Sequence, residues 1–157
     1  METKTERYLR WGQARDQLFL SMRQSSKEER VTAYEQLEKK LLKEAHSPFE
    51  RREIQRRITA DVLRATAPGG WSGFAPRLRR MERLGYTDID DRVLVCVLTA
   101  QASAGAPAGI RKATELIADL ERRSRRLDPE RRREIGHALE RARQFAGIDH
   151  DPGPDSW

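Results

Sequence analysis

Helix-start signals recur along this chain, and they restrict its fold more than any other feature of the sequence. A capping side chain precedes a glutamate, an aspartate or a proline at four places: Ser26 with Glu29, Ser47 with Pro48 and Glu50, Thr87 with Asp90, and Asp128 with Pro129. Such pairs satisfy backbone N–H groups that the first turn of a helix leaves free, and proline suits the first helical position. The sequence therefore predicts a series of helices with well-defined starts.

Apolar residues recur between these starts at the spacing of one helix face. The pattern predicts helices near residues 5–23, from 26, over 48–66, over 76–85, over 88–104, from 110 and from 129. In the third of these helices, Arg52 and Arg56 point away from the apolar stripe. Residues 67–76 hold so much glycine and proline that we expect a loop there.

The run from Val93 to Leu98 has two interpretations. Its β-branched residues favour a strand, but no second segment offers a strand partner, and a lone strand leaves its backbone hydrogen bonds unmade. We therefore expect an apolar central helix with Val95 and Leu98 as its most buried positions. The fold class is then all-α, a single compact bundle of about six or seven helices, with one domain over 1–147 and a flexible tail over 148–157.

Length and composition exclude several classes of protein. The chain has 157 residues, the size of one domain, and no apolar stretch approaches the roughly 18 residues of a membrane helix. The polar start of the chain does not resemble a secretory signal. Cys96 is the only cysteine and lies in an apolar run, so we expect a buried, inert thiol. These observations indicate a cytoplasmic protein.

Few residues suggest a metal, a cofactor or catalysis. Glu134 and His137 lie three residues apart, which is half of a di-metal carboxylate site, but the sequence has no second such pair. Gly69, Gly70 and Gly73 lack the Gly-Lys-Ser/Thr sequence of a phosphate-binding loop. We therefore expect no catalytic residue, no metal and no cofactor, although an active site assembled only by the tertiary structure would escape this search.

Two aromatic residues stand in the glycine-rich segment. Trp71 and Phe74 lie among small residues that would let a loop change shape. Tryptophan is enriched in interface anchors, so the pair could contact a partner protein together with Arg52 and Arg56. The alternative is that both rings pack into the core and close a gap between helices.

Arginine accounts for the basic character of the chain. There are 31 Lys and Arg against 25 Asp and Glu, a net charge of +6, and 25 of the 31 are Arg. Candidate phosphate contacts in the most basic part of the chain are Arg51, Arg52, Arg56, Arg57, Arg77, Arg79, Arg80 and Arg83. A second basic stretch runs from Arg122 to Arg133. Solvated helix faces and GC-rich, bacterial-like coding would produce the same excess.

The sequence favours a non-enzymatic helical adaptor, regulator or complex subunit that acts by binding another protein. Its amphipathic helices, arginines and aromatic segment suit an interface. The alternative is a nonspecific nucleic-acid-binding protein, or a ribonucleoprotein subunit, that uses the arginine-rich surface. The identity of a protein partner is open, and so is assembly as a homo-oligomer.

Overall fold

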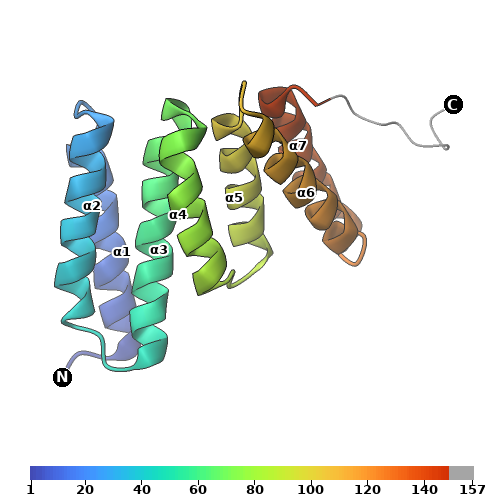
Figure 1. Ribbon diagram of the computed structural model, residues 1–157. Helices are drawn as coiled ribbons and strands as arrows, with labels where there is room; N and C mark the ends of the chain where they lie inside the picture. The colour runs from blue at the N-terminus through green and yellow to red at the C-terminus, as the bar shows by residue number, and fades with distance from the viewer. Residues whose placement is uncertain (149–157) are drawn as a thin grey trace, which may run out of the picture. The chain divides into compact units, whose positions relative to one another are not determined.

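The computed structural model describes residues 1–148, and over that range it contains seven α-helices, one short 3₁₀-helix and no strand (Figure 1). The helices are α1 (Lys4–Ser21), α2 (Lys27–Leu42), α3 (Pro48–Thr66), η1 (Ala67–Gly69), α4 (Trp71–Leu84), α5 (Ile89–Ala102), α6 (Pro107–Ser124) and α7 (Pro129–Ala146). The prediction of an all-α protein with about six or seven helices is confirmed. Except for Ile148, the expected tail lies outside the described residues.

The chain divides into two compact units. Unit 1 is Met1–Ala65 and unit 2 is Thr66–Trp157, so the boundary falls in the last turn of α3. Each unit has its own hydrophobic cluster. The expectation of one domain over 1–147 stays a prediction. No helix among the described residues is long and apolar enough to cross a membrane.

The core of unit 1 joins its three helices. Its buried members are Trp11, Val31, Tyr34, Leu41, Ile54, Ile58 and Val62. They come from α1, α2 and α3 at the spacing that the sequence predicts for one helix face. Phe19 is an apolar residue of α1 that is 49% exposed, and it lines a pocket of unit 1.

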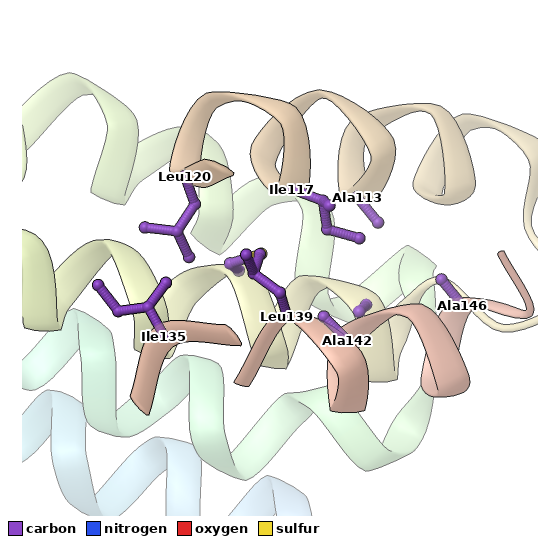
Figure 2. Packing of buried hydrophobic residues seen from close by; sticks show 9 residues of the cluster. Ala113, Ile117, Leu120, Ile135, Leu139, Ala142 and Ala146 are labelled. Carbon is purple, nitrogen blue, oxygen red and sulfur yellow. The ribbon is translucent and has the colours of Figure 1, made fainter. Parts of the chain in front are cut away.

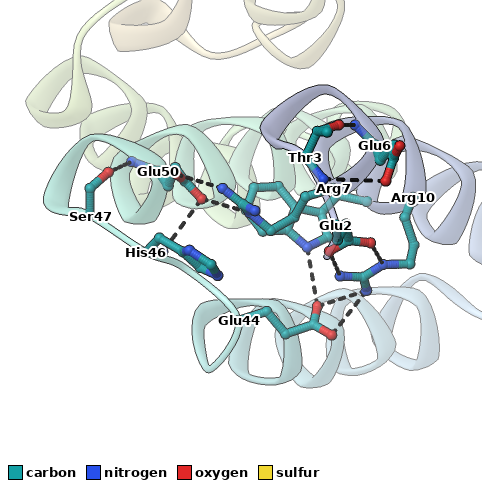
Figure 3. A network of polar contacts seen from close by, with 10 residues as sticks. Glu2, Thr3, Glu6, Arg7, Arg10, Glu44, His46, Ser47 and Glu50 are labelled. Atoms are coloured by element: carbon teal, nitrogen blue, oxygen red, sulfur yellow. Dashed lines mark hydrogen bonds and ion pairs between the residues drawn. The ribbon is translucent and has the colours of Figure 1, made fainter.

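A polar network ties the start of α1 to the first turn of α3 and to the residues before it (Figure 3). The Arg7 guanidinium donates two hydrogen bonds to the Glu50 carboxylate, at 2.9 and 3.0 Å, and both residues are buried. The Ser47 side chain accepts a hydrogen bond from the Glu50 N–H, at 3.1 Å, as predicted. The second bond of a capping box would join the Ser47 N–H to the Glu50 side chain, and here the donor differs. The Glu50 carboxylate instead accepts from the His46 N–H, at 3.4 Å.

The core of unit 2 surrounds α5, which contacts η1, α4, α6 and α7. The apolar run is a helix, as predicted, and Val95 and Leu98 are both buried, at 1% and 7% exposed. Leu98 is not among the most buried positions of α5, because Thr99 and Ala100 are fully buried. Figure 2 shows the side chains of α6 and α7 that meet beside α5: Ala113, Ile117, Leu120, Ile135, Leu139, Ala142 and Ala146. The alanines keep the side-chain layer thin, which favours close helix packing.

The predicted loop over residues 67–76 is wrong. Gly70, with φ at +99°, turns the chain between η1 and α4, and α4 then begins at Trp71 with Pro76 inside it. Burial explains the difference, because Phe74 and Leu78 of this helix are buried. The packing of an apolar face outweighs the weak helix propensity of glycine and proline.

The other helix starts follow the capping signals closely. Ser26 with Glu29 forms both bonds of its capping box, and Asp128 caps α7. The predicted capping pair of Thr87 and Asp90 is wrong, because the actual pair lies one residue later in the sequence. Asp88 caps α5 and accepts from the Asp91 N–H at 2.9 Å. Aspartates three residues apart satisfy the same geometry one position later.

Candidate functional site

The structure places the aromatic pair in the packing of unit 2. Phe74 is fully buried, which favours the core alternative for this ring, and the contact of the pair with a partner stays a prediction. Trp71 is half-buried, and its ring lies 6.0 Å from the Phe74 ring. A Cβ atom added to Gly109 would lie 2.9 Å from Trp71 Cδ2, which shows that the indole packs directly on the α6 backbone.

Two predicted interface arginines differ in their surroundings. Arg52 is exposed, as expected. The outward orientation predicted for Arg56 is wrong, because Arg56 is buried and its Nη1 lies 2.7 Å from Glu53 Oε2. Burial of a charge requires a partner of opposite sign, and Glu53 supplies it one turn away.

The predicted phosphate-binding arginines are divided between the two units. Arg51, Arg52, Arg56 and Arg57 belong to unit 1, and Arg77, Arg79, Arg80 and Arg83 belong to unit 2. Several already bind protein groups, since Arg57 pairs with Glu53 and Arg77 donates to the Gly73 carbonyl. Arg79 and Arg83 are exposed on α4. Binding of nucleic acid by this set stays a prediction.

A pocket of about 250 Å³ in unit 1 was missed by the sequence interpretation. Its lining comes from the end of α1, the first half of α2 and the end of α3: Phe19, Met22, Arg23, Arg30, Tyr34, Asp61, Arg64 and Ala65. These residues are far apart along the chain, so no local motif could reveal them. The only available signal was the continuation of the apolar stripe of α1 to Phe19 and Met22.

The position of Arg30 follows from the end of α1. Its Nε donates to the Met22 carbonyl at 3.0 Å, and its Nη2 donates to the Arg23 carbonyl at 2.7 Å. The last carbonyls of a helix have no partner within the helix and carry a partial negative charge. Arg30 therefore holds the turn between α1 and α2 and leaves its positive charge on the pocket wall.

The one carboxylate in the pocket is neutralised from outside the lining. Asp61 is buried and accepts two hydrogen bonds from Arg15, at 2.7 and 2.9 Å. Burial raises the pKa of the neighbouring Tyr34, and the Asp61 charge adds to that increase. The phenol therefore stays neutral, and its hydroxyl stays protonated, at physiological pH.

Two further arginines are available at this pocket. Arg23 and Arg64 are exposed, and within the described part of the chain neither forms an ion pair or a side-chain hydrogen bond. The pocket thus combines apolar contact surface from Phe19, Met22 and Ala65 with uncompensated positive charge. Such a site suits a ligand that has both an apolar group and an anionic group.

Metal chemistry has little support among residues 1–148, where no group of three or more His, Cys, Asp or Glu side chains is placed to hold an ion. Glu134 and His137 are both exposed, and Glu134 pairs with Arg131 at 2.9 Å.

Comparison of the chain with known protein families, curated proteins and solved structures finds no match.

Proposed function

We propose that this protein is a non-enzymatic helical adaptor or regulatory subunit that binds an acidic, amphipathic segment of a partner protein in the pocket of unit 1. The observation that carries the proposal is the unpaired state of Arg23 and Arg64 beside the exposed ring of Phe19. We place this activity in the cytoplasm, where the single thiol of Cys96 stays reduced.

The size of the pocket favours one anchoring side chain over a whole small molecule. Sites for drug-sized ligands are commonly about 300–1,000 Å³, and this pocket is about 250 Å³. A large apolar side chain of the partner would fill it and contact Met22 and Phe19. Buried anchors of this kind contribute much of the affinity of protein interfaces.

Charge complementarity defines the rest of the partner segment. A carboxylate can accept two parallel hydrogen bonds from one guanidinium, and a fixed pair of arginines selects against basic sequences. Arg23 lies in the turn after α1 and Arg64 lies near the end of α3, so the two arginines reach the apolar surface from different parts of the chain. Acidic residues on both sides of an apolar anchor would satisfy both arginines.

Peptide display on the purified full chain tests the proposal. We expect enriched peptides to combine Asp or Glu with a large apolar residue. Arg64→Ala should weaken their binding by about two- to fivefold, the range for one exposed ion pair. The matched control is Arg52→Ala, which removes an exposed arginine from the same helix outside the pocket.

Phe19→Ser tests the apolar contact without changing the charge of the pocket, because it removes the ring from an exposed position and leaves the core intact. Equal weakening by Arg52→Ala and Arg64→Ala, or peptides with no acidic bias, would contradict the proposal. It would also fail if the chain retains only nucleic acid from its native extract and nuclease removes every partner.

A further inference from the structure

A second cavity, of about 590 Å³, lies within unit 2 where the chain enters α5 and leaves α6. Its lining comes from two short segments: Tyr86, Thr87, Asp88, Ile89 and Arg92 on one side, and Asp119, Arg122, Arg123 and Arg126 on the other. The volume falls within the range that holds small molecules. The proposed binding pocket of unit 1 shares no residue with this cleft.

One carboxylate organises three of the four arginines. Asp119 accepts from Arg123 at 2.9 Å and from Arg122 at 3.3 Å, and Arg92 lies 3.5 Å away. Burial alone would raise the pKa of Asp119, but the three guanidinium groups hold it below its ordinary value. Asp119 therefore stays ionised and holds the arginines in place, while its two oxygens leave most of their N–H donors free.

Among the described residues, Arg92 has a second contact, and Arg126 has none. The Arg92 guanidinium lies 4.7 Å from the centre of the Tyr86 ring, a cation–π contact that restricts its motion. The Arg126 side chain is exposed and has no partner in the described part of the chain. The cleft thus combines ordered guanidinium groups with a free one.

The charges that line the cleft leave an excess of two. Four arginines face two aspartates, and Asp88 already accepts from the Asp91 N–H as the cap of α5. A phosphate monoester carries about −1.5 to −2 charges near pH 7 and has three strong acceptor oxygens. It matches both the excess charge and the free donors, whereas one carboxylate would neutralise only half of the excess.

The surrounding surface favours a single anionic group over a nucleic-acid backbone. Arg131, the next arginine along the chain, lies in the first turn of α7 and pairs with Asp90 and Glu134. Asp90 and Glu130 are themselves exposed near the helix starts. These carboxylates interrupt any continuous positive path, which a phosphate backbone would need.

We propose that this cleft binds a small phosphate monoester, with the phosphate held by Arg92, Arg122 and Arg126. This inference is independent of the peptide pocket in unit 1. Loss of peptide binding in Arg64→Ala leaves phosphate binding intact, and the two proposals can fail separately.

Calorimetric titration of the full chain with phenyl phosphate, in a buffer free of phosphate and sulfate, tests the site. Benzenesulfonate is the matched probe, because it has the same ring and also three terminal oxygens, but it carries only one negative charge. We expect one phenyl phosphate per chain, bound about tenfold more tightly than benzenesulfonate. Amide and arginine Nε–H resonances of residues 86–92 and 119–126 should shift on binding.

Arg126→Ala should weaken phenyl phosphate binding about fivefold or more, and Arg125→Ala is the control. Arg125 is the exposed neighbour of Arg126 and does not line the cleft. No saturable binding, or equal weakening by both variants, would overturn the proposal. Tighter binding of a single-stranded oligonucleotide that depends equally on Arg125 and Arg126 would also overturn it in favour of a nucleic-acid surface.

Discussion

At the scale of single residues, the charged residues that are buried in unit 1 lie in pairs of opposite sign. Arg7 with Glu50, Arg15 with Asp61 and Arg56 with Glu53 each bring a guanidinium within 3.0 Å of a carboxylate. Removing a charge from water is costly, and a well-aligned partner offsets that cost. Removing one partner of such a pair would therefore leave an uncompensated charge in the interior of unit 1.

The buried pair of Arg7 and Glu50 predicts sensitivity to acid. The hydrogen bonds from Arg7 lower the pKa of Glu50 below its ordinary 4.5. The stabilisation is fully present above pH 4.5 and is lost as the pH falls through the lower pKa of the folded state. Glu50→Gln should therefore lower the free energy of unfolding at pH 7, and the difference from the unmodified chain should shrink below pH 4.5.

Urea unfolding measured by circular dichroism between pH 7 and pH 2.5 checks this prediction. Asp16→Asn, at an exposed position of α1, serves as the control with little expected effect. A difference for Glu50→Gln that stays constant down to pH 2.5 would show that ionisation of Glu50 does not stabilise the fold.

Tyr8 presents the opposite case, a polar atom buried without a partner. Its ring stacks on Trp11 with centroids 5.2 Å apart, and its hydroxyl oxygen has no hydrogen bond in the described part of the chain. Tyr8→Phe should be neutral or should stabilise the protein by up to about 1 kcal/mol, because an unpaired buried hydroxyl is costly. Tyr8→Ala should destabilise by about 1–3 kcal/mol through lost packing. Thermal unfolding distinguishes these outcomes, and a clear loss in Tyr8→Phe would reveal a partner for the hydroxyl.

At the scale of helices, close packing decides where each helix begins and which residues it can contain. α4 includes Gly73 and Pro76 because its buried face, with Phe74 and Met81, contributes more than local propensity costs. α6 begins at Pro107 and contains Gly109, although the sequence suggested a break there. Gly109 is needed at this position because Trp71 and Ser103 leave no room for a Cβ atom.

Two glycines within helices should therefore respond oppositely to alanine. Gly109→Ala would place a Cβ 2.9 Å from Trp71 and from the Ser103 Cα, and we expect a loss of about 1–3 kcal/mol from overpacking. At Gly136 in α7, a Cβ meets no atom within 4 Å. Gly136→Ala should stabilise by about 0.5–1 kcal/mol through better helix propensity. Chemical denaturation measures both, and equal effects would refute the packing argument.

At the scale of the whole molecule, the chain forms two units that each combine a core with a basic cavity. The only thiol, Cys96, belongs to the core of unit 2 and is 1% exposed. Burial raises its pKa to about 12, so the thiolate is scarce at pH 8 while unit 2 is folded. Reaction at this thiol therefore reports the opening of unit 2.

We predict that a thiol reagent labels native Cys96 at least about 10³-fold more slowly than the denatured chain at pH 8, because labelling requires the unit to open. Leu98→Ala removes a core side chain at a cost of about 2–5 kcal/mol and should accelerate labelling by at least about tenfold. Leu9→Ala, at a position 62% exposed, is the control and should leave the rate nearly unchanged. Rapid labelling of the unmodified native chain would contradict the buried state of Cys96.

Local sequence determined most of the secondary structure. Capping side chains such as Ser26 and Asp128 accept hydrogen bonds from the first free N–H groups of a helix, and the spacing of apolar residues determines the buried face. Both signals lie within a few residues of each other, so the start and the apolar face of a helix can be predicted from local sequence. The helical state and burial of Val95 and Leu98 were predictable for the same reason, together with the lack of any strand partner.

Tertiary packing decided the features that depend on residues distant along the chain. It buried Arg56, set the start of α4 at Trp71, and joined Phe19 to Arg64 around one pocket. A similar convergence brought Arg92 to Asp119. The free energy of burying a face or pairing a charge belongs to groups that meet only in the folded chain, so no spacing rule along the sequence can contain it.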